Sequence, residues 1–177
     1  MAAQDVMGAV CDKLVGGMMF HSDHADLCRL LGVEWLARAH EDGYLHDSKA
    51  HAKMRRKCIR HVGMMASAGR QERTRTLDQW RGRRMADVQC DTRPIALRDA
   101  MRDWCEWETG AADTYRTAYQ RLLSCGHMAL AEEARELAVE TEDELSRARA
   151  MWVEMDACGF DMPHVMEMGG DETWPRR

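Results

Sequence analysis

The sequence has little proline and phenylalanine, no cysteine pair motif and no long apolar run. Only 3 of its 177 residues are proline and 2 are phenylalanine, whereas Ala, Leu, Met, Glu and Arg, which favour helices, are abundant. No apolar stretch approaches the ~20 residues of a membrane-spanning helix. The N-terminus also lacks the basic start and apolar segment of a secretory signal. We therefore expect an all-α protein of the cytoplasm with no membrane partner.

Charge and cysteine usage narrow the function classes further. The net charge is -5 at pH 7, so no general positive field favours nucleic acid, and we expect no nucleic-acid partner. The 7 cysteines are scattered and form no C-x-x-C pair. This pattern indicates reduced thiols and argues against a disulfide framework or a zinc ribbon.

Four long segments carry apolar residues at helical spacing, and none shows convincing strand alternation. The motifs E-D-G-Y and S-C-G-H would join these segments in two pairs, and such short turns predict antiparallel neighbours. The prediction is an antiparallel four-helix bundle with helices at about 22–42, 47–68, 94–124 and 127–157.

Three segments fall outside these helices. Residues 1–19 are expected to form an N-terminal extension with a short helix, broken at Gly16-Gly17. Residues 70–93 are too long for an ordinary loop, so we expect a crossover that runs the length of the bundle. The stretch after 159 is expected to be a mobile tail.

Two glutamates in the stretch W-C-E-W-E-T-G-A-A-D-T-Y have different expected fates. At ~100° per residue, Glu108 falls within the apolar stripe that includes Trp104 and Tyr115, whereas Glu106 points away from it. A carboxylate in apolar surroundings is costly unless its charge is compensated. Glu106 is therefore interpreted as surface charge, and Glu108 as a candidate ligand.

Every expected helix has at least one ionisable residue on its inner face. Each has an ordinary interpretation: a hydrogen-bonded core histidine, a helix cap at the aspartate, or ion pairs with Arg38 or Arg55. A helix rises ~1.5 Å per residue, so two residues at equal distances before and after a turn lie at the same level of the bundle. By this measure, the inner ionisable residues of two helices joined by a turn lie opposite each other. The candidate metal ligands are Glu34, Asp47, His51, Glu108, Glu140 and Glu144.

Carboxylates with an imidazole inside a bundle suit iron or manganese. Over about residues 20–157 the chain resembles the ferritin-like superfamily. The resemblance rests on the paired hairpins, on a crossover containing Trp80, and on the motif C-E-W-E-T-G-A-A-D-T-Y-R-T-A-Y followed by E-T-E-D-E-L. That superfamily includes ferritins, bacterioferritins and rubrerythrins. The resemblance implies a left-handed four-helix bundle, a homo-oligomer (a dimer or larger), and a di-iron or di-manganese centre that handles iron, oxygen or peroxide.

The chain departs from the family pattern at the ligands. Family sites use Glu-x-x-His on the second helix, but Ser48 stands three residues before His51, and no histidine lies near Glu140 or Glu144. Two hypotheses follow: a metal-dependent oxidoreductase, or a bundle with a degenerate site and no cofactor that acts as a structural or stress-associated interaction protein. His21 and His24 are interpreted as an exposed helix start, with a surface metal site as the alternative.

Overall fold

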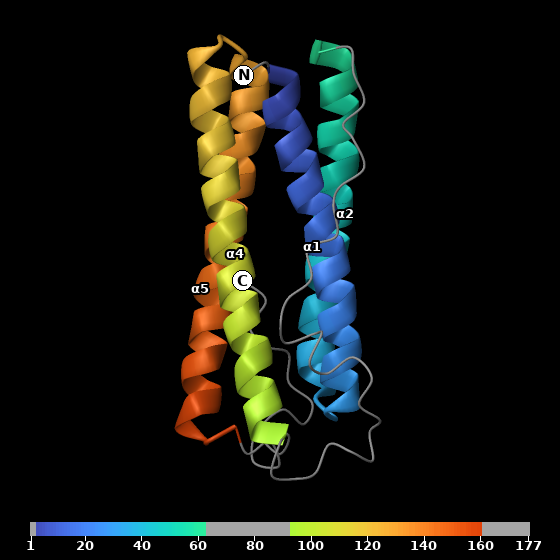
Figure 1. Ribbon diagram of the computed structural model, residues 1–177, viewed down its shortest axis with the longest axis vertical. Coiled ribbons are helices and arrows are strands. Elements are labelled where there is room, and N and C mark those ends of the chain that lie inside the picture. Colours follow the sequence, from blue (N-terminus) through green and yellow to red (C-terminus); the bar gives the residue numbers. More distant parts are fainter. Residues whose placement is uncertain (1–2, 63–92, 161–177) are drawn as a thin grey trace.

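The computed structural model describes residues 3–62 and 93–160, and every regular element in these ranges is a helix (Figure 1). The helices are α1 (Ala3–Leu30), α2 (Glu34–Val62), α4 (Arg93–Ser124) and α5 (Met128–Ala157). At ~1.5 Å per residue each is more than about 40 Å long. None of these four helices is apolar enough over a sufficient length to cross a bilayer. The described part of the chain is an all-α bundle.

The helices pack most closely in sequential pairs. α1 lies against α2 and α4 against α5, while α1 and α4 form the main contact between the two pairs. The contact between α2 and α5 is much smaller. The C-terminal end of α2 and the N-terminal end of α4 lie at opposite ends of the bundle (Figure 1). Among the described helices, α2 and α5 are therefore neighbours that pack much less closely than α1 and α4 do.

Two glycines end helices at the turns within these pairs. Gly32 has φ +74° and follows α1, where the Val33 amide donates to the Cys28 carbonyl at 2.8 Å. Gly126 has φ +77° and follows α4, where the His127 amide donates to the Leu122 carbonyl at 2.9 Å. Both arrangements are Schellman caps, in which a residue with positive φ lets the chain satisfy the last carbonyls of the helix.

The first half of the chain differs from the sequence prediction. The expected turn at E-D-G-Y lies inside α2, and the actual turn is Leu31–Val33. The expected extension 1–19 is the first part of α1, which continues without a break through Gly16 and Gly17. The reason is packing: these glycines and Gly43 lie where other side chains approach the helix backbone closely. The sequence pattern suggests that they break helices, but in the fold they permit contacts.

In the second half, α4 and α5 begin and end within one residue of the expected 94–124 and 127–157. The crossover 70–93, including Trp80, lies outside the described residues except for Arg93, where α4 begins. Most of the expected tail, 161–177, is outside them as well. Its first residue, Phe160, is described and is buried in the core, against the tail expectation at that position.

The core consists of two apolar clusters separated along the bundle. One contains Phe20, Leu36, Met101, Trp104 and Met151, and the other contains Val10, Leu14, Met54, Tyr115 and Leu137. On each helix, the residues between the two clusters include polar side chains or glycine. This middle layer contains the buried His21, Glu108 and Thr141.

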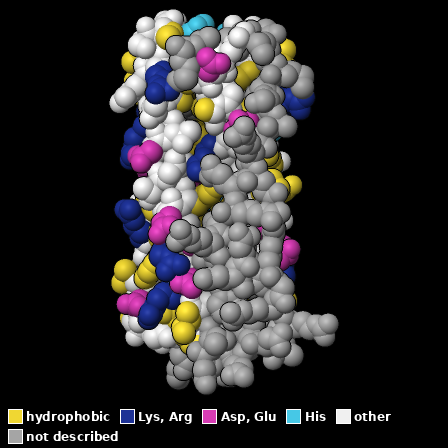
Figure 2. Space-filling model, in the orientation of Figure 1, with side chains coloured by type: hydrophobic (Ala, Val, Ile, Leu, Met, Phe, Trp, Pro, Cys, Tyr) yellow, Lys and Arg dark blue, Asp and Glu magenta, His cyan; other side chains and the backbone are white. Residues whose placement is uncertain are grey.

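On the described part of the face seen in Figure 2, basic and acidic side chains are interspersed. The described helices have local ion pairs along one helix, such as Arg102 with Asp99 at 2.9 Å and Arg116 with Asp113 at 2.9 Å. Exposed pairs of this kind contribute at most about 1 kcal/mol each. The bundle is therefore stabilised mainly by its two apolar clusters.

Candidate metal centre

Three donor side chains meet in the middle layer. His21 from α1, Glu108 from α4 and Glu144 from α5 each offer one ligand atom, and these atoms all lie within 4.8 Å of one another. His21 and Glu108 are buried, and Glu144 is half-buried. Within the described residues no other group of three His, Cys, Asp or Glu side chains meets this condition. This is the candidate site.

Glu108 is held by two neighbours. The Trp104 indole Nε1 donates to Glu108 Oε1 at 3.0 Å, and His21 Nε2 lies 3.5 Å from the same oxygen. Burial lowers the pKa of His21, but the hydrogen bond and the charge of Glu108 outweigh it, so the pKa is raised. The imidazolium of His21 is therefore the main cation that compensates the buried Glu108 charge.

The other ring nitrogen of His21 contacts a second buried histidine. His21 Nδ1 lies 3.1 Å from Nδ1 of His40 on α2. Burial and the charge of His21 hold the pKa of His40 well below its usual range, so His40 is neutral and His21 is the donor. A partner on the far nitrogen fixes the orientation of an imidazole, as it does for metal-binding histidines. His40 thereby keeps His21 Nε2 directed toward Glu108.

α2 contributes an outer pair to the site, Asp47 and His46. His46 Nδ1 lies 3.4 Å from Asp47 Oδ1 and 4.0 Å from Glu144 Oε1, and His46 Nε2 lies 3.1 Å from Glu140 Oε2. The hydrogen bond with Asp47 is the largest cause that raises the pKa of His46 to about 9, and Glu144 and Glu140 add to it. His46 is thus a cation among three carboxylates.

The layer has more negative charge than its surroundings readily accommodate. Burial, followed by repulsion from Glu108, raises the pKa of Glu144 to about 7, although His46 and His21 oppose the shift. Tyr115 lies on α4 beyond Glu108, and its pKa is raised by burial and by the charges of Asp47, Glu108 and Glu144. An added cation would relieve this repulsion.

Glycines in α1 and α2 make room for the donors. A Cβ on Gly43 would lie 2.6–2.8 Å from three atoms of the His21 ring, and a Cβ on Gly17 would collide with the Asp47 carboxylate. A Cβ on Gly16 would lie 2.8 Å from Cη2 of Trp107, which closes the α1–α4 side. The positions of His21 and Asp47 therefore depend on backbone sites without side chains.

The structure brings some of the six sequence candidates together and separates others. Glu108 and Glu144 are two of the three converging donors, and Asp47 and Glu140 lie beside them through His46. Glu34 is the first residue of α2, and it pairs with Arg38 at 3.8 Å, but both side chains are exposed and neither points into the core as expected. His51 is half-buried one turn beyond Asp47 and is not among the converging donors.

The histidines of the site were missed by sequence reasoning. His21 and His24 were interpreted as an exposed helix start, which is wrong, because α1 begins at Ala3 and both are buried. The signal was available: residues 6, 10, 14, 17, 21, 24 and 28 follow helical spacing if the helix is continued through Gly16-Gly17. His46 gave no comparable signal, because it lies at the edge of the buried face of α2.

His24 lies beside the site but is not one of its donors. It stacks on Phe20 with ring centroids 3.9 Å apart, and its Nδ1 contacts the Phe20 carbonyl at 3.0 Å. Burial lowers the pKa of His24 to about 3, so the ring is neutral. Its Nε2 lies 3.9 Å from Asp103 Oδ2. His24 and His40 thus give the inner side of the layer two neutral imidazoles.

Comparison of the chain with protein-family models, with curated proteins and with solved structures found no significant match. The resemblance to ferritin-like proteins therefore stays a prediction, as do the expected homo-oligomer and the absence of a nucleic-acid partner.

Proposed function

We propose that this chain is a metal-binding protein of ferritin-like architecture whose site holds divalent iron or manganese for chemistry with oxygen or peroxide. The observation that carries the proposal is the convergence of His21, Glu108 and Glu144 from three helices within 4.8 Å. Two carboxylates and one imidazole form a hard donor set with nitrogen, which suits these ions. An ion bound by three protein groups keeps coordination positions for water or an oxidant.

The electrostatics of the layer support the same proposal. A divalent ion would offset the charges of Glu108 and Glu144, whose repulsion contributes to the raised pKa of Glu144. It would also replace the proton on His21 Nε2, since a ligating imidazole must be neutral at that nitrogen. His40 would keep the ring of His21 oriented through its contact with Nδ1. The charge of Asp47 adds to the raised pKa of Glu144, so the same ion would offset this charge as well.

The ferritin-like part of the proposal concerns topology. Turns of three residues between α1 and α2, and between α4 and α5, favour antiparallel pairs. α2 ends and α4 begins at opposite ends of the bundle (Figure 1). This placement of the two helix ends is what a bundle with a long crossover between its second and third helices requires.

The test is an anaerobic Fe(II) titration followed by oxygen, with metal stoichiometry measured on the same samples. Trp104 donates to Glu108, so its fluorescence should report binding directly. We expect one ion per chain, with affinity reduced about a hundredfold or more by Glu108→Gln, because a ligand is lost. Glu106→Gln is the matched control: it removes the same charge from the same helix, at an exposed residue paired with Arg102.

Two outcomes would contradict parts of the proposal. A loading below about a tenth of an ion per chain would exclude the metal site, because a bound ion must occupy most chains at saturation. A stoichiometry of two would instead support the di-metal centre expected from the resemblance, with Asp47 and His46 beside the second ion.

One observation favours a second candidate, a bundle with a structural role and no metal. The charge of Glu108 is already compensated by His21 and Trp104, and His46 compensates the outer carboxylates. In that case the layer would fix the register of the helices. The same titration separates the two candidates, because only the metal-binding protein responds to Fe(II).

A further inference from the structure

Within the described part of the chain, the polar residues of the middle layer differ in how much of each side chain is exposed to solvent. The side chains of His21 and Glu108 are 2% and 4% exposed, whereas Glu144 is 16% exposed. Further out on α2 and α5, His46 is 30% exposed and Glu140 is 56% exposed. Exposure therefore increases steadily from the α1–α4 side toward the junction of α2 and α5.

The packing of the helices explains this gradient. On the α1–α4 side, Trp107 lies against Gly16 and Gly17 and stacks on Phe20 with ring centroids 5.1 Å apart. Lys13 covers the outside of the Trp107 ring, with Nζ 3.7 Å from its centroid. α2 and α5 make much less contact than α1 and α4 do. Water and ions therefore have a shorter path to the donors between α2 and α5.

A groove lies along this junction, and the site lies beyond one of its lining residues, His46, whose Nδ1 is 4.0 Å from Glu144 Oε1. Its volume is about 190 Å³, room for several water molecules at roughly 30 Å³ each in the liquid. Ala50, Met54 and Leu137 line its apolar part, while His46 and Glu140 line the end nearest the site. Glu140 lies one turn from Glu144 on α5, so the two carboxylates share a helix face.

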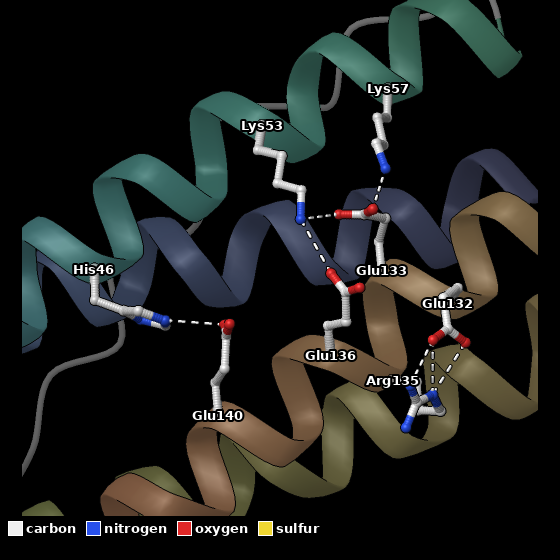
Figure 3. Close-up of polar contacts among 8 residues, drawn as sticks. All are labelled: His46, Lys53, Lys57, Glu132, Glu133, Arg135, Glu136 and Glu140. Atoms are coloured by element: carbon white, nitrogen blue, oxygen red, sulfur yellow. Dashed lines mark hydrogen bonds and ion pairs between the residues drawn. The ribbon is translucent and has the colours of Figure 1, made fainter. Parts of the chain in front are cut away.

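Ion pairs close the groove where apolar packing is weak. Figure 3 shows His46 directed at Glu140, and Lys53 directed at Glu133 and Glu136, across the space between α2 and α5. The contact distances are 3.1 Å for His46–Glu140, and 2.7 Å and 3.1 Å for the two lysine contacts. Lys53 and Glu140 are about half exposed, so these pairs open at small cost.

We propose that the α2–α5 groove is the access route for the metal ion, and that the His46–Glu140 pair is its gate. This inference rests on the proposed function, because it concerns how the ion reaches His21, Glu108 and Glu144. A divalent cation in the groove meets the carboxylates of Glu133, Glu136 and Glu140, and Glu144 lies one helical turn beyond Glu140. Glu140 releases His46, binds the cation transiently and transfers it inward. Glu140 thus controls the rate of loading, and the inner donors control affinity.

The test is stopped-flow mixing of the full chain with Fe(II) under anaerobic conditions, followed by tryptophan fluorescence. Glu140→Gln should slow the association rate by about three- to tenfold, because the carboxylate that attracts the cation is lost. The final stoichiometry should not change. Lys53→Gln should accelerate association, since it removes a cation from the groove and frees Glu136, while Glu133 keeps its ion pair with Lys57. Glu142→Gln is the matched control: it lies on the same helix but pairs with Arg116 outside the groove, so its rate should equal that of the wild type.

Each other outcome overturns a specific statement. If Glu140→Gln and the wild type load at the same rate while both bind Fe(II), the route is wrong and the metal site stands. If Glu140→Gln abolishes binding at equilibrium, Glu140 is a ligand of the ion and has no gating role. If the wild-type protein binds no Fe(II), the proposed function fails, and the access route fails with it.

Discussion

Replacing Gly43 by alanine tests the contact between α2 and the site histidine most directly. A Gly→Ala change inside a helix ordinarily stabilises it by about 1 kcal/mol. Here the new Cβ would lie 2.6, 2.7 and 2.8 Å from Cε1, Nε2 and Nδ1 of His21, well inside van der Waals contact. The ring is buried and is held on both sides by Glu108 and His40, so it cannot simply rotate away. Overpacking of this kind costs about 1–3 kcal/mol.

The two effects have opposite signs, and we expect the steric cost to exceed the helix propensity. Gly43→Ala should therefore lower the free energy of unfolding by about 0–2 kcal/mol. Gly8→Ala is the matched control, because Gly8 lies inside α1 and a Cβ there would meet nothing within 4 Å. That variant should gain up to about 1 kcal/mol. Urea unfolding followed by far-UV circular dichroism measures both.

A double-mutant cycle identifies the cause. The cycle combines Gly43→Ala with His21→Ala. All four proteins also carry Glu108→Gln, because removing the His21 imidazole alone would leave the buried Glu108 carboxylate without its cation. Without the ring, the Gly43→Ala substitution should stabilise α2 by about 1 kcal/mol, giving a coupling of about 1–3 kcal/mol. A coupling near zero would refute the contact, and Gly43 would then have to be explained as part of a turn.

Four further predictions concern two titrating side chains, metal binding and thiol reactivity. The pKa of Glu144 is raised to about 7 in the folded protein, from 4.5 in the unfolded chain. The metal-free protein should therefore lose stability as the pH rises from 4.5 through 7. Glu144→Gln should remove this loss, as urea unfolding at several pH values would show. Conversely, the pKa of His24 is lowered to about 3, so stability should fall as pH decreases from 6.5 toward 3, and a flat acid limb would contradict its neutral burial. A saturating divalent ion at a hundred times its dissociation constant should raise the unfolding free energy by about 2.7 kcal/mol, which thermal unfolding would detect. A maleimide should label the exposed Cys125 and Cys158 in the native protein much faster than the buried Cys11, as mass spectrometry would show.

The second half of the fold could be predicted because its local signals agree. Pro94 stands at the start of α4, apolar residues continue at one helical period, and Gly126 ends the helix with the positive φ that glycine adopts readily. The same period placed Glu108 inside and Glu106 outside, and the structure has Glu108 buried and Glu106 exposed. Periodicity is sufficient here because the apolar spacing continues on both sides of Gly110, the one glycine within α4.

The first half could not be predicted in the same way because glycine serves two purposes there. Gly32 ends α1 with a positive φ, whereas Gly17 and Gly43 remain helical and admit the Asp47 carboxylate and the His21 ring. Both uses give the same letter in the sequence. Only the neighbouring helix distinguishes them, and that neighbour is unknown until the turn has been placed.

This ambiguity explains which donors were found and which were not. Placing the turn at Gly43 pairs Glu34 with His51 at one level of the bundle, whereas placing it at Gly32 brings His21 of α1 opposite the 40–47 stretch of α2. The carboxylates of α4 and α5 are unaffected, since their turn was placed correctly. Moving the turn from Gly43 to Gly32 thus leaves Glu108 and Glu144 in position, keeps Asp47 beside them, and replaces Glu34 and His51 by His21 and His46. The consequence is chemical as well as geometric, because the sequence reading put one imidazole beside the carboxylates of α4 and α5, and the structure puts two there.

With His21 and His46 both able to bear a proton, the middle layer can compensate its own charge when no ion is bound. A cation must then displace protons as it binds, so loading should release protons and should be weaker at low pH.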